Sequence, residues 1–247
     1  MATKRISLLR IPIDILPPEQ VEQEILELVE KPGTKQIIFL SVWGLLKARS
    51  NAKFRECVNN ADLILPVSKS LLHGASFLKL AVPVRYDPFS AVISFLNALD
   101  SRYKSVYLFG DRKKTLSKAE HNVRMTFPGL HVIGRYVGYY PKHVEPDIVS
   151  AIYKASPSLV LISDGVSEKD CWPYHRRNRF SSSTFVYYRD MIGIFAKRVK
   201  HVSPKIFDKG LEIWGEILHN PLKIFLVFPF FWYIIVLVWY KIIKPDQ

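Results

Sequence analysis

Three aspartates and two glycines fall at or near predicted strand ends, and their residue types could do chemistry: Asp87, Asp111, Asp164, Gly110 and Gly138. A carboxylate can take a proton from a substrate hydroxyl as a general base. Glycine lets the backbone approach a ligand closely. Because ligands of open α/β sheets usually bind at the carboxyl ends of the strands, we expect these residues near a binding site. Ordinary turn glycines and a helix-capping aspartate fit the same spacing.

The elements that would hold these residues are clearest in Val106–Tyr140. Its first apolar run, Val106–Phe109, predicts a buried strand. Apolar residues then recur at four-residue spacing, which predicts a helix with one apolar face. Pro128-Gly129 ends this helix, and a second strand begins at Val132. Strand, helix and strand within 35 residues form a βαβ unit, which implies a parallel sheet.

The rest of the chain continues this alternation. Further strands are predicted at Ile6–Ile11, Gln36–Leu40, Leu63–Leu65 and Leu159–Ile162, and further helices at Val21–Val29, Trp43–Lys47, Leu71–Leu78, Pro88–Leu99 and Val144–Ala155. Regular alternation argues for a three-layer α/β fold with a mainly parallel sheet. The pattern loosens after Trp172. We therefore predict an α/β core over residues 1–172, a basic appendage over 173–221 and an apolar membrane anchor over 222–247.

Composition narrows the partners and the compartment. The chain has 247 residues and a net charge of +13, which predicts an anionic partner: lipid headgroups, nucleic acid or a phosphorylated substrate. No interleaving of aromatic and basic residues matches a known nucleic-acid motif, which disfavours nucleic acid. The two cysteines and seven histidines show no metal-site spacing, and we expect neither metal nor cofactor. Arg10 and Asp14 interrupt any signal-peptide core, so the folded part is expected in the cytoplasm.

Basic and apolar residues toward the end of the chain predict membrane attachment. Residues 176–205 carry a net charge of +7, and residues 224–240 are 17 uncharged residues, eight of them aromatic. As a helix such a segment spans about 26 Å, at the short limit for crossing a bilayer. Pro229 also permits a kinked or re-entrant path. The residues expected at the membrane are Arg198, Lys200, Lys205, Lys223, Phe230, Phe231, Trp232, Trp239 and Lys241.

Three segments, by their order and spacing, resemble the WecG/TagA/CpsF family of bacterial glycosyltransferases from about Ile6 to Pro221. They are Ala61–Pro66, Val106–Tyr140, and Gly210–Glu212 followed by Pro221. The resemblance implies a Rossmann-like fold with a membrane-associating C-terminal appendage. It also implies transfer of N-acetylmannosamine or a related sugar from a UDP donor to a polyprenyl-diphosphate-linked acceptor. That transfer takes place at the cytoplasmic face of the bacterial plasma membrane.

The residues that match the family's catalytic motifs have changed. Its proposed general base, the aspartate of "LPDG", falls at Val67, and a valine cannot accept a proton. The hydroxyl of its "TxN" element persists at Ser41, and the acid of its "GxD" pattern persists at Asp87. An arginine that holds a diphosphate falls at Glu216, which reverses the charge. Lys223 replaces another arginine, so a point charge stands in place of a planar fork.

The donor site is expected to lie at the strand ends and in the segment that follows Asp164. The expected donor-binding residues are Gly110, Asp111, Gly138, Tyr139, Asp164, Gly165, Lys169 and Asp170. Two hypotheses follow for the chemistry. The chain is a pseudo-glycosyltransferase that acts as a membrane-attached scaffold or regulator, with a protein partner. Alternatively, it is an active transferase that uses Asp87, Asp111 or Asp164 as a displaced base.

Overall fold

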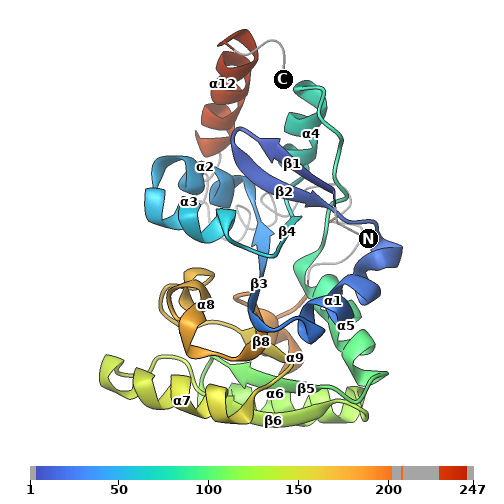
Figure 1. The fold of residues 1–247 in the computed structure, drawn as a ribbon, viewed down its shortest axis with the longest axis vertical. Coiled ribbons are helices and arrows are strands. Elements are labelled where there is room, and N and C mark those ends of the chain that lie inside the picture. Colours follow the sequence, from blue (N-terminus) through green and yellow to red (C-terminus); the bar gives the residue numbers. More distant parts are fainter. Residues whose placement is uncertain (1–3, 202–206, 208–227, 244–247) are drawn as a thin grey trace.

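A six-stranded, all-parallel sheet forms the centre of the protein (Figure 1). The computed structural model describes residues 4–201, 207 and 228–243. The strands lie in the order β4-β3-β8-β7-β5-β6. Their bounds are β3 Gly33–Leu40, β4 Leu63–Pro66, β5 Ser105–Phe109, β6 His131–Tyr136, β7 Leu159–Ile162 and β8 Ser182–Tyr187. The predicted α/β class is confirmed, and the fold is Rossmann-like.

Helices cover both faces of the sheet, because alternate residues of each strand point to opposite faces. The helices are α1 Val21–Glu30, α2 Val42–Ser50, α3 Ala52–Asn59, α4 Lys69–Phe77, α5 Pro88–Asp100, α6 Lys113–Thr126, α7 Glu145–Ala155, α8 Cys171–His175, α9 Met191–Phe195 and α12 Phe228–Ile243. Val106 and Leu108 of β5 pack with α1, α5, α6 and α9. Tyr107 and Phe109 pack on the other face with α7 and α8. A third apolar cluster joins β3 and β4 to α2, α3 and α4.

The N-terminal segment is a β-hairpin, where the sequence predicts one strand over Ile6–Ile11. β1 (Lys4–Leu8) pairs antiparallel with β2 (Ile11–Ile15). The turn falls at Leu9 and Arg10, whose φ angles are 52° and 69°. The one-strand prediction is wrong because this turn contains neither glycine nor asparagine, the usual hairpin residues. Leu9 is also fully buried, so the apolar pattern continues through the turn.

The interior strand β8 lies where the predicted pattern loosens. It pairs with β3 on one side and with β7 on the other. Its first three residues are polar, and two of them, Ser183 and Thr184, are buried. No apolar alternation therefore marks it as a strand. Because β8 lies past residue 172, part of the basic appendage predicted over 173–221 continues the sheet.

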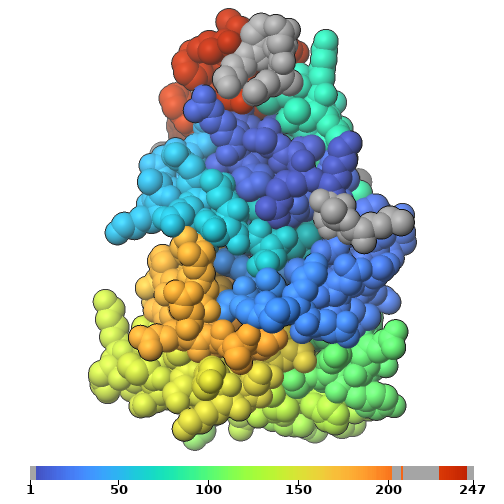
Figure 2. All heavy atoms as spheres, in the orientation of Figure 1, coloured from blue at the N-terminus to red at the C-terminus, as the bar shows by residue number. Residues whose placement is uncertain are grey.

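The predicted membrane segment is described from Phe228 onward, as the 16-residue helix α12. Within the described ranges, no helix combines the length and the hydropathy that a bilayer crossing needs. One side of α12 is buried through Tyr233, Val236 and Leu237. The helix sits at the end of the molecule opposite β6 and α7 (Figure 2). Predictions on Lys205, Glu216 and Lys223 fall outside the described residues.

Candidate functional site

The loops that follow β5, β6 and β7 interlock at the carboxyl edge of the sheet. The Asp111 amide donates to the Asp164 carbonyl at 2.6 Å, and the Gly138 amide donates to the Asp111 carbonyl at 2.8 Å. The Tyr139 amide donates to the Gly165 carbonyl at 2.7 Å. Five predicted donor-site residues from three strand ends are therefore brought together by backbone hydrogen bonds.

The glycines of this edge are required by close backbone packing. A Cβ atom on Gly110 would lie 2.9 Å from the Ser163 carbonyl carbon, and the Gly110 φ angle is +136°. A Cβ atom on Gly138 would lie 2.6 Å from the Asp164 carbonyl oxygen. Real Cβ atoms do not approach backbone atoms this closely, so larger residues would push the loops apart. Packing alone thus accounts for both glycines.

Asp111 is buried and paired rather than free to act as a base. Its carboxylate accepts a hydrogen bond from the Arg112 amide at 2.6 Å. It also pairs with the Arg198 guanidinium at 3.2 Å. The alternative reading of Asp111 as a helix cap is wrong, because Arg112 is the N-cap residue of α6. Arg198 was expected at the membrane, and its pairing with Asp111 places it at this edge of the sheet.

Asp164 is more accessible and is engaged by a tyrosine. The Tyr139 hydroxyl donates to the Asp164 carboxylate at 2.5 Å, which raises the pKa of Tyr139 above its usual value. The Arg189 guanidinium lies 3.9 Å from the same carboxylate, and Arg112 lies 5.8 Å from the Tyr139 ring. Sequence reasoning missed Arg112 and Arg189 as site residues, although Arg189 belongs to the basic run. Guanidinium groups are the usual partners of a diphosphate, although Arg189 already lies beside the Asp164 carboxylate.

Ser41 and Val67, which the sequence resemblance assigns to catalytic motifs, follow the ends of β3 and β4. Val67 follows β4, and its amide donates to the Leu40 carbonyl at 2.9 Å. The Val67 carbonyl accepts a hydrogen bond from the Arg85 Nε at 2.8 Å. Ser41 caps α2, because its hydroxyl accepts from the Gly44 amide at 3.1 Å. The Ser41 hydroxyl therefore has a structural role as the N-terminal cap of α2.

Asp87 forms a pair with a histidine that sequence reasoning missed. The Asp87 carboxylate caps α5 by accepting from the Ser90 amide at 2.8 Å. The same oxygen lies 2.8 Å from the His201 Nε2 atom. The preceding residue, Tyr86, donates its amide to the carbonyl of Pro66 at 2.8 Å. This backbone hydrogen bond joins the residue before Asp87 to the residue before Val67.

Lys169 and Asp170 lie on the side of the sheet that α3 covers. The Asp170 carbonyl accepts from the Gln36 side chain at 2.6 Å and lies 3.8 Å from the Cys57 Sγ. Burial raises the pKa of the Asp170 carboxyl to about 6. Lys169 is exposed. The contacts of Asp170 are thus with β3 and α3, not with the three interlocked loops.

The segment after Gly165 is anchored by the buried residue Trp172. Its indole nitrogen donates to the Glu145 carboxylate at 2.8 Å and to the Tyr140 hydroxyl at 3.1 Å. Arg176 pairs with the same glutamate at 2.8 Å. Among the residues that the structure describes, no group of three or more His, Cys, Asp or Glu side chains could hold a metal ion.

The fold and this edge together define a Rossmann-like α/β protein with interlocked loops at the carboxyl ends of its parallel strands, where open α/β sheets usually bind ligands. The model of the glycosyl transferase WecG/TagA/CpsF family matches residues 6–245. Because that match covers nearly the whole chain, the protein belongs to this family, which confirms the resemblance found in the sequence. Membership implies a cell-envelope glycosyltransferase, with a sugar donor and a lipid-linked acceptor as the family's substrates. A comparison with curated proteins gives no match.

Proposed function

We propose that this protein is a pseudo-glycosyltransferase, attached to the cytoplasmic face of the bacterial plasma membrane. It serves as a scaffold or regulator of cell-envelope polysaccharide assembly. The observation that carries the proposal is Val67, which occupies the family's base position at the end of β4. Loss of a positioned general base typically costs about 10²–10⁴-fold in rate.

The carboxylates near the donor side support this proposal, because each already has a protein partner. Asp111 pairs with Arg198, and Asp164 accepts from Tyr139. Each carboxylate would therefore have to give up its protein partner before it could take a proton from a substrate. Binding of a UDP-sugar requires no such base. We therefore expect retained donor binding through the arginines of this edge, without transfer.

Membrane attachment is supported by charge and by α12. The net charge of +13 favours anionic lipids. Large apolar side chains on the outer side of α12 are exposed, among them Trp232 at 59% and Trp239 at 58%. Exposed tryptophans beside lysines are typical of helices that lie in the membrane interface. A lipid-bound scaffold would also present its remaining surface to a protein partner.

The test is turnover by the purified full-length protein. UDP-N-acetylmannosamine and a polyprenyl-diphosphate-linked amino sugar are supplied in detergent, and product is followed by mass spectrometry. We expect no sustained turnover by the wild type. In Val67→Asp, product formation should rise at least tenfold above the level measured for the wild type. Val67→Asn is the matched control for Val67→Asp, because asparagine has nearly the same shape as aspartate and its amide cannot act as a base. Sustained turnover by the wild type would overturn the proposal.

A second candidate function is active transfer, and the pair of Asp87 and His201 favours it. A histidine oriented by a carboxylate is a common general base. Asp87, which contacts His201 at 2.8 Å, lies two residues along the chain from Arg85. The Arg85 side chain donates to the Val67 carbonyl. If the wild type turns over, His201→Gln should lower kcat at least a hundredfold and remove the acidic limb of its pH profile. A His201→Gln rate within twofold of the wild type would reject this base.

A further inference from the structure

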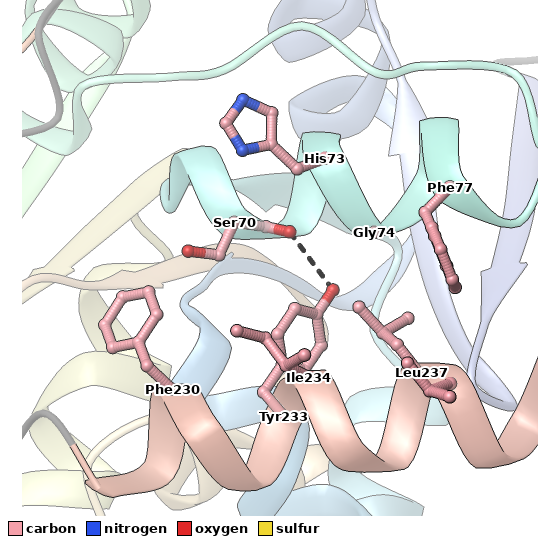
Figure 3. Close-up of a pocket in the computed structure, with 9 residues that line it drawn as sticks. Ser70, His73, Gly74, Phe77, Phe230, Tyr233, Ile234 and Leu237 are labelled. Atoms are coloured by element: carbon pink, nitrogen blue, oxygen red, sulfur yellow. Dashed lines mark hydrogen bonds between the residues drawn. The ribbon is translucent and has the colours of Figure 1, made fainter.

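An apolar groove of about 450 Å³ lies between α4 and α12 (Figure 3). Ligand pockets in proteins are commonly about 300–1,000 Å³, so this groove is large enough for a ligand. Phe77 contributes one wall from α4, and Ile234, Leu237 and Val238 contribute the other from α12. Because hydrocarbon dominates these walls, the groove suits an apolar occupant better than a sugar or a nucleotide.

The groove has a fixed width because α12 is held on α4 at a defined distance. The buried Tyr233 hydroxyl donates to the Ser70 carbonyl at 3.2 Å. A Cβ atom on Gly74 would overlap the Tyr233 hydroxyl oxygen, so glycine is required for this contact. At the other end, the Lys241 ammonium donates to the Phe77 carbonyl at 3.1 Å and lies 4.0 Å from the Phe77 ring. These contacts make the groove part of the folded protein.

The walls of the groove continue into the outer apolar face of α12. Ile234 and Val238 line the groove, and they are also 53% and 43% exposed. Next to them on the helix lie Ile235, at 57% exposed, and Ile242, at 72% exposed. Exposed apolar patches of this kind mark surfaces that meet a membrane or a partner. Whatever covers the outer face of α12 therefore has direct access to the groove.

We propose that the groove binds one acyl chain of an anionic phospholipid from the membrane in which α12 lies. Phospholipid is the bulk component of such a membrane, and the groove opens directly onto the face that would contact it. Lys241 at one end of the groove supplies a cation for the phosphate of the headgroup. The bound chain would bring the α4 wall of the groove into contact with lipid, in addition to the contact that the outer face of α12 makes. The inference rests on the membrane association proposed above.

The test uses the full-length protein on phosphatidylglycerol vesicles that contain a phosphatidylglycerol with a diazirine in its acyl chain. After photolysis, peptide mass spectrometry maps the cross-linked residues. We expect cross-links on Phe77 and His73 of α4 as well as on α12. Cross-links confined to the outer side of α12, at Ile235 and Ile242, would overturn the groove assignment. Absence of vesicle binding would instead refute the membrane association itself, and with it this inference.

A pair of substitutions on α12 gives the matched control. Val238→Trp fills the groove and should lower the α4 cross-links at least tenfold, while vesicle sedimentation stays unchanged. Ile235→Trp places the same side chain outside the groove and should leave the α4 cross-links intact. Loss of α4 cross-links on addition of unlabelled farnesyl phosphate would reassign the groove to an isoprenoid chain and overturn the acyl assignment. A dimer that buries α12 on the vesicles, detected by cross-links between isotope-labelled and unlabelled chains, would also overturn it.

Discussion

Substitution of Gly138 by alanine tests whether the interlocked loops, rather than a ligand, require this glycine. The new methyl group would lie 2.6 Å from the Asp164 carbonyl oxygen and 3.0 Å from the Asp111 amide nitrogen. Both neighbours are backbone atoms, so neither can rotate away as a side chain would. Overpacking of this kind costs about 1–3 kcal/mol.

The displaced loops would also lose hydrogen bonds. The bond from the Asp111 amide to the Asp164 carbonyl joins the two crowded atoms, and the bond from the Gly138 amide to the Asp111 carbonyl starts at the substituted residue. Each contributes about 0.5–1.5 kcal/mol. Together with the overpacking, Gly138→Ala should lower the free energy of unfolding by about 2–6 kcal/mol. Urea denaturation followed by far-UV circular dichroism measures this quantity in the absence of any ligand.

Gly44→Ala is the matched control, because it makes the same chemical change in a helix. The nearest atom to its new methyl group is the Leu40 Cδ1 at 3.1 Å, the end of a flexible side chain. Alanine is a better helix former than glycine by about 0.5–1 kcal/mol, so this variant should match or slightly exceed the wild type. A Gly138→Ala protein within about 0.5 kcal/mol of the wild type would refute the packing explanation.

Two further predictions concern the segment after Gly165. Asp170 has a folded-state pKa of about 6, against an ordinary value of 3.8, so its charged form opposes folding above pH 6 and this cost vanishes as the pH falls below about 4. Asp170→Asn should therefore raise the free energy of unfolding by about 1–2 kcal/mol at pH 7.5 but not at pH 4, and an equal gain at both would contradict this cause. Trp172→Phe removes the hydrogen bond to Glu145 and leaves a gap in the core, which should cost about 2–4 kcal/mol in urea denaturation. A loss below about 0.5 kcal/mol would mean that the indole nitrogen contributes nothing.

Local periodicity predicted most of the fold because most of its strands are short apolar runs. Val106–Phe109 and Leu159–Ile162 are buried on both faces, and such strands read as continuous apolar segments. The sequence did not predict the strand β8, because the polar residues Ser183 and Thr184 occupy buried positions in it. Ser183 is tolerated there because its hydroxyl donates to the Pro157 carbonyl at 2.8 Å. That compensation comes from another element, so no pattern within β8 encodes it.

In the candidate site, too, the sequence predicted some residues but not their partners. The residues that follow strands, such as Asp111 and Asp164, could be located from the sequence because a strand end is a local signal. Their partners could not, because Arg198 is 87 residues from Asp111, and His201 is 114 residues from Asp87. Contacts at such separations follow from the order of strands in the sheet. The strand β8 lies between β3 and β7 and brings the chain that follows it to the carboxyl edge. The sequence did not predict this strand, so it could not predict these contacts.

The structure also changes how the basic run would act on a membrane if the proposed attachment holds. Of its eight cations, Arg176 pairs with Glu145 and Glu168, and Arg198 pairs with Asp111. Arg189 lies beside a carboxylate as well. A basic residue near an anionic surface contributes about 1 kcal/mol, but a cation balanced by a neighbouring carboxylate adds little to the net field. The electrostatic attraction of this run is therefore weaker than its net charge of +7 indicates. In the proposed attachment, the apolar outer face of α12 would then supply the larger share of membrane binding, so vesicle binding should persist at salt concentrations that screen the basic run.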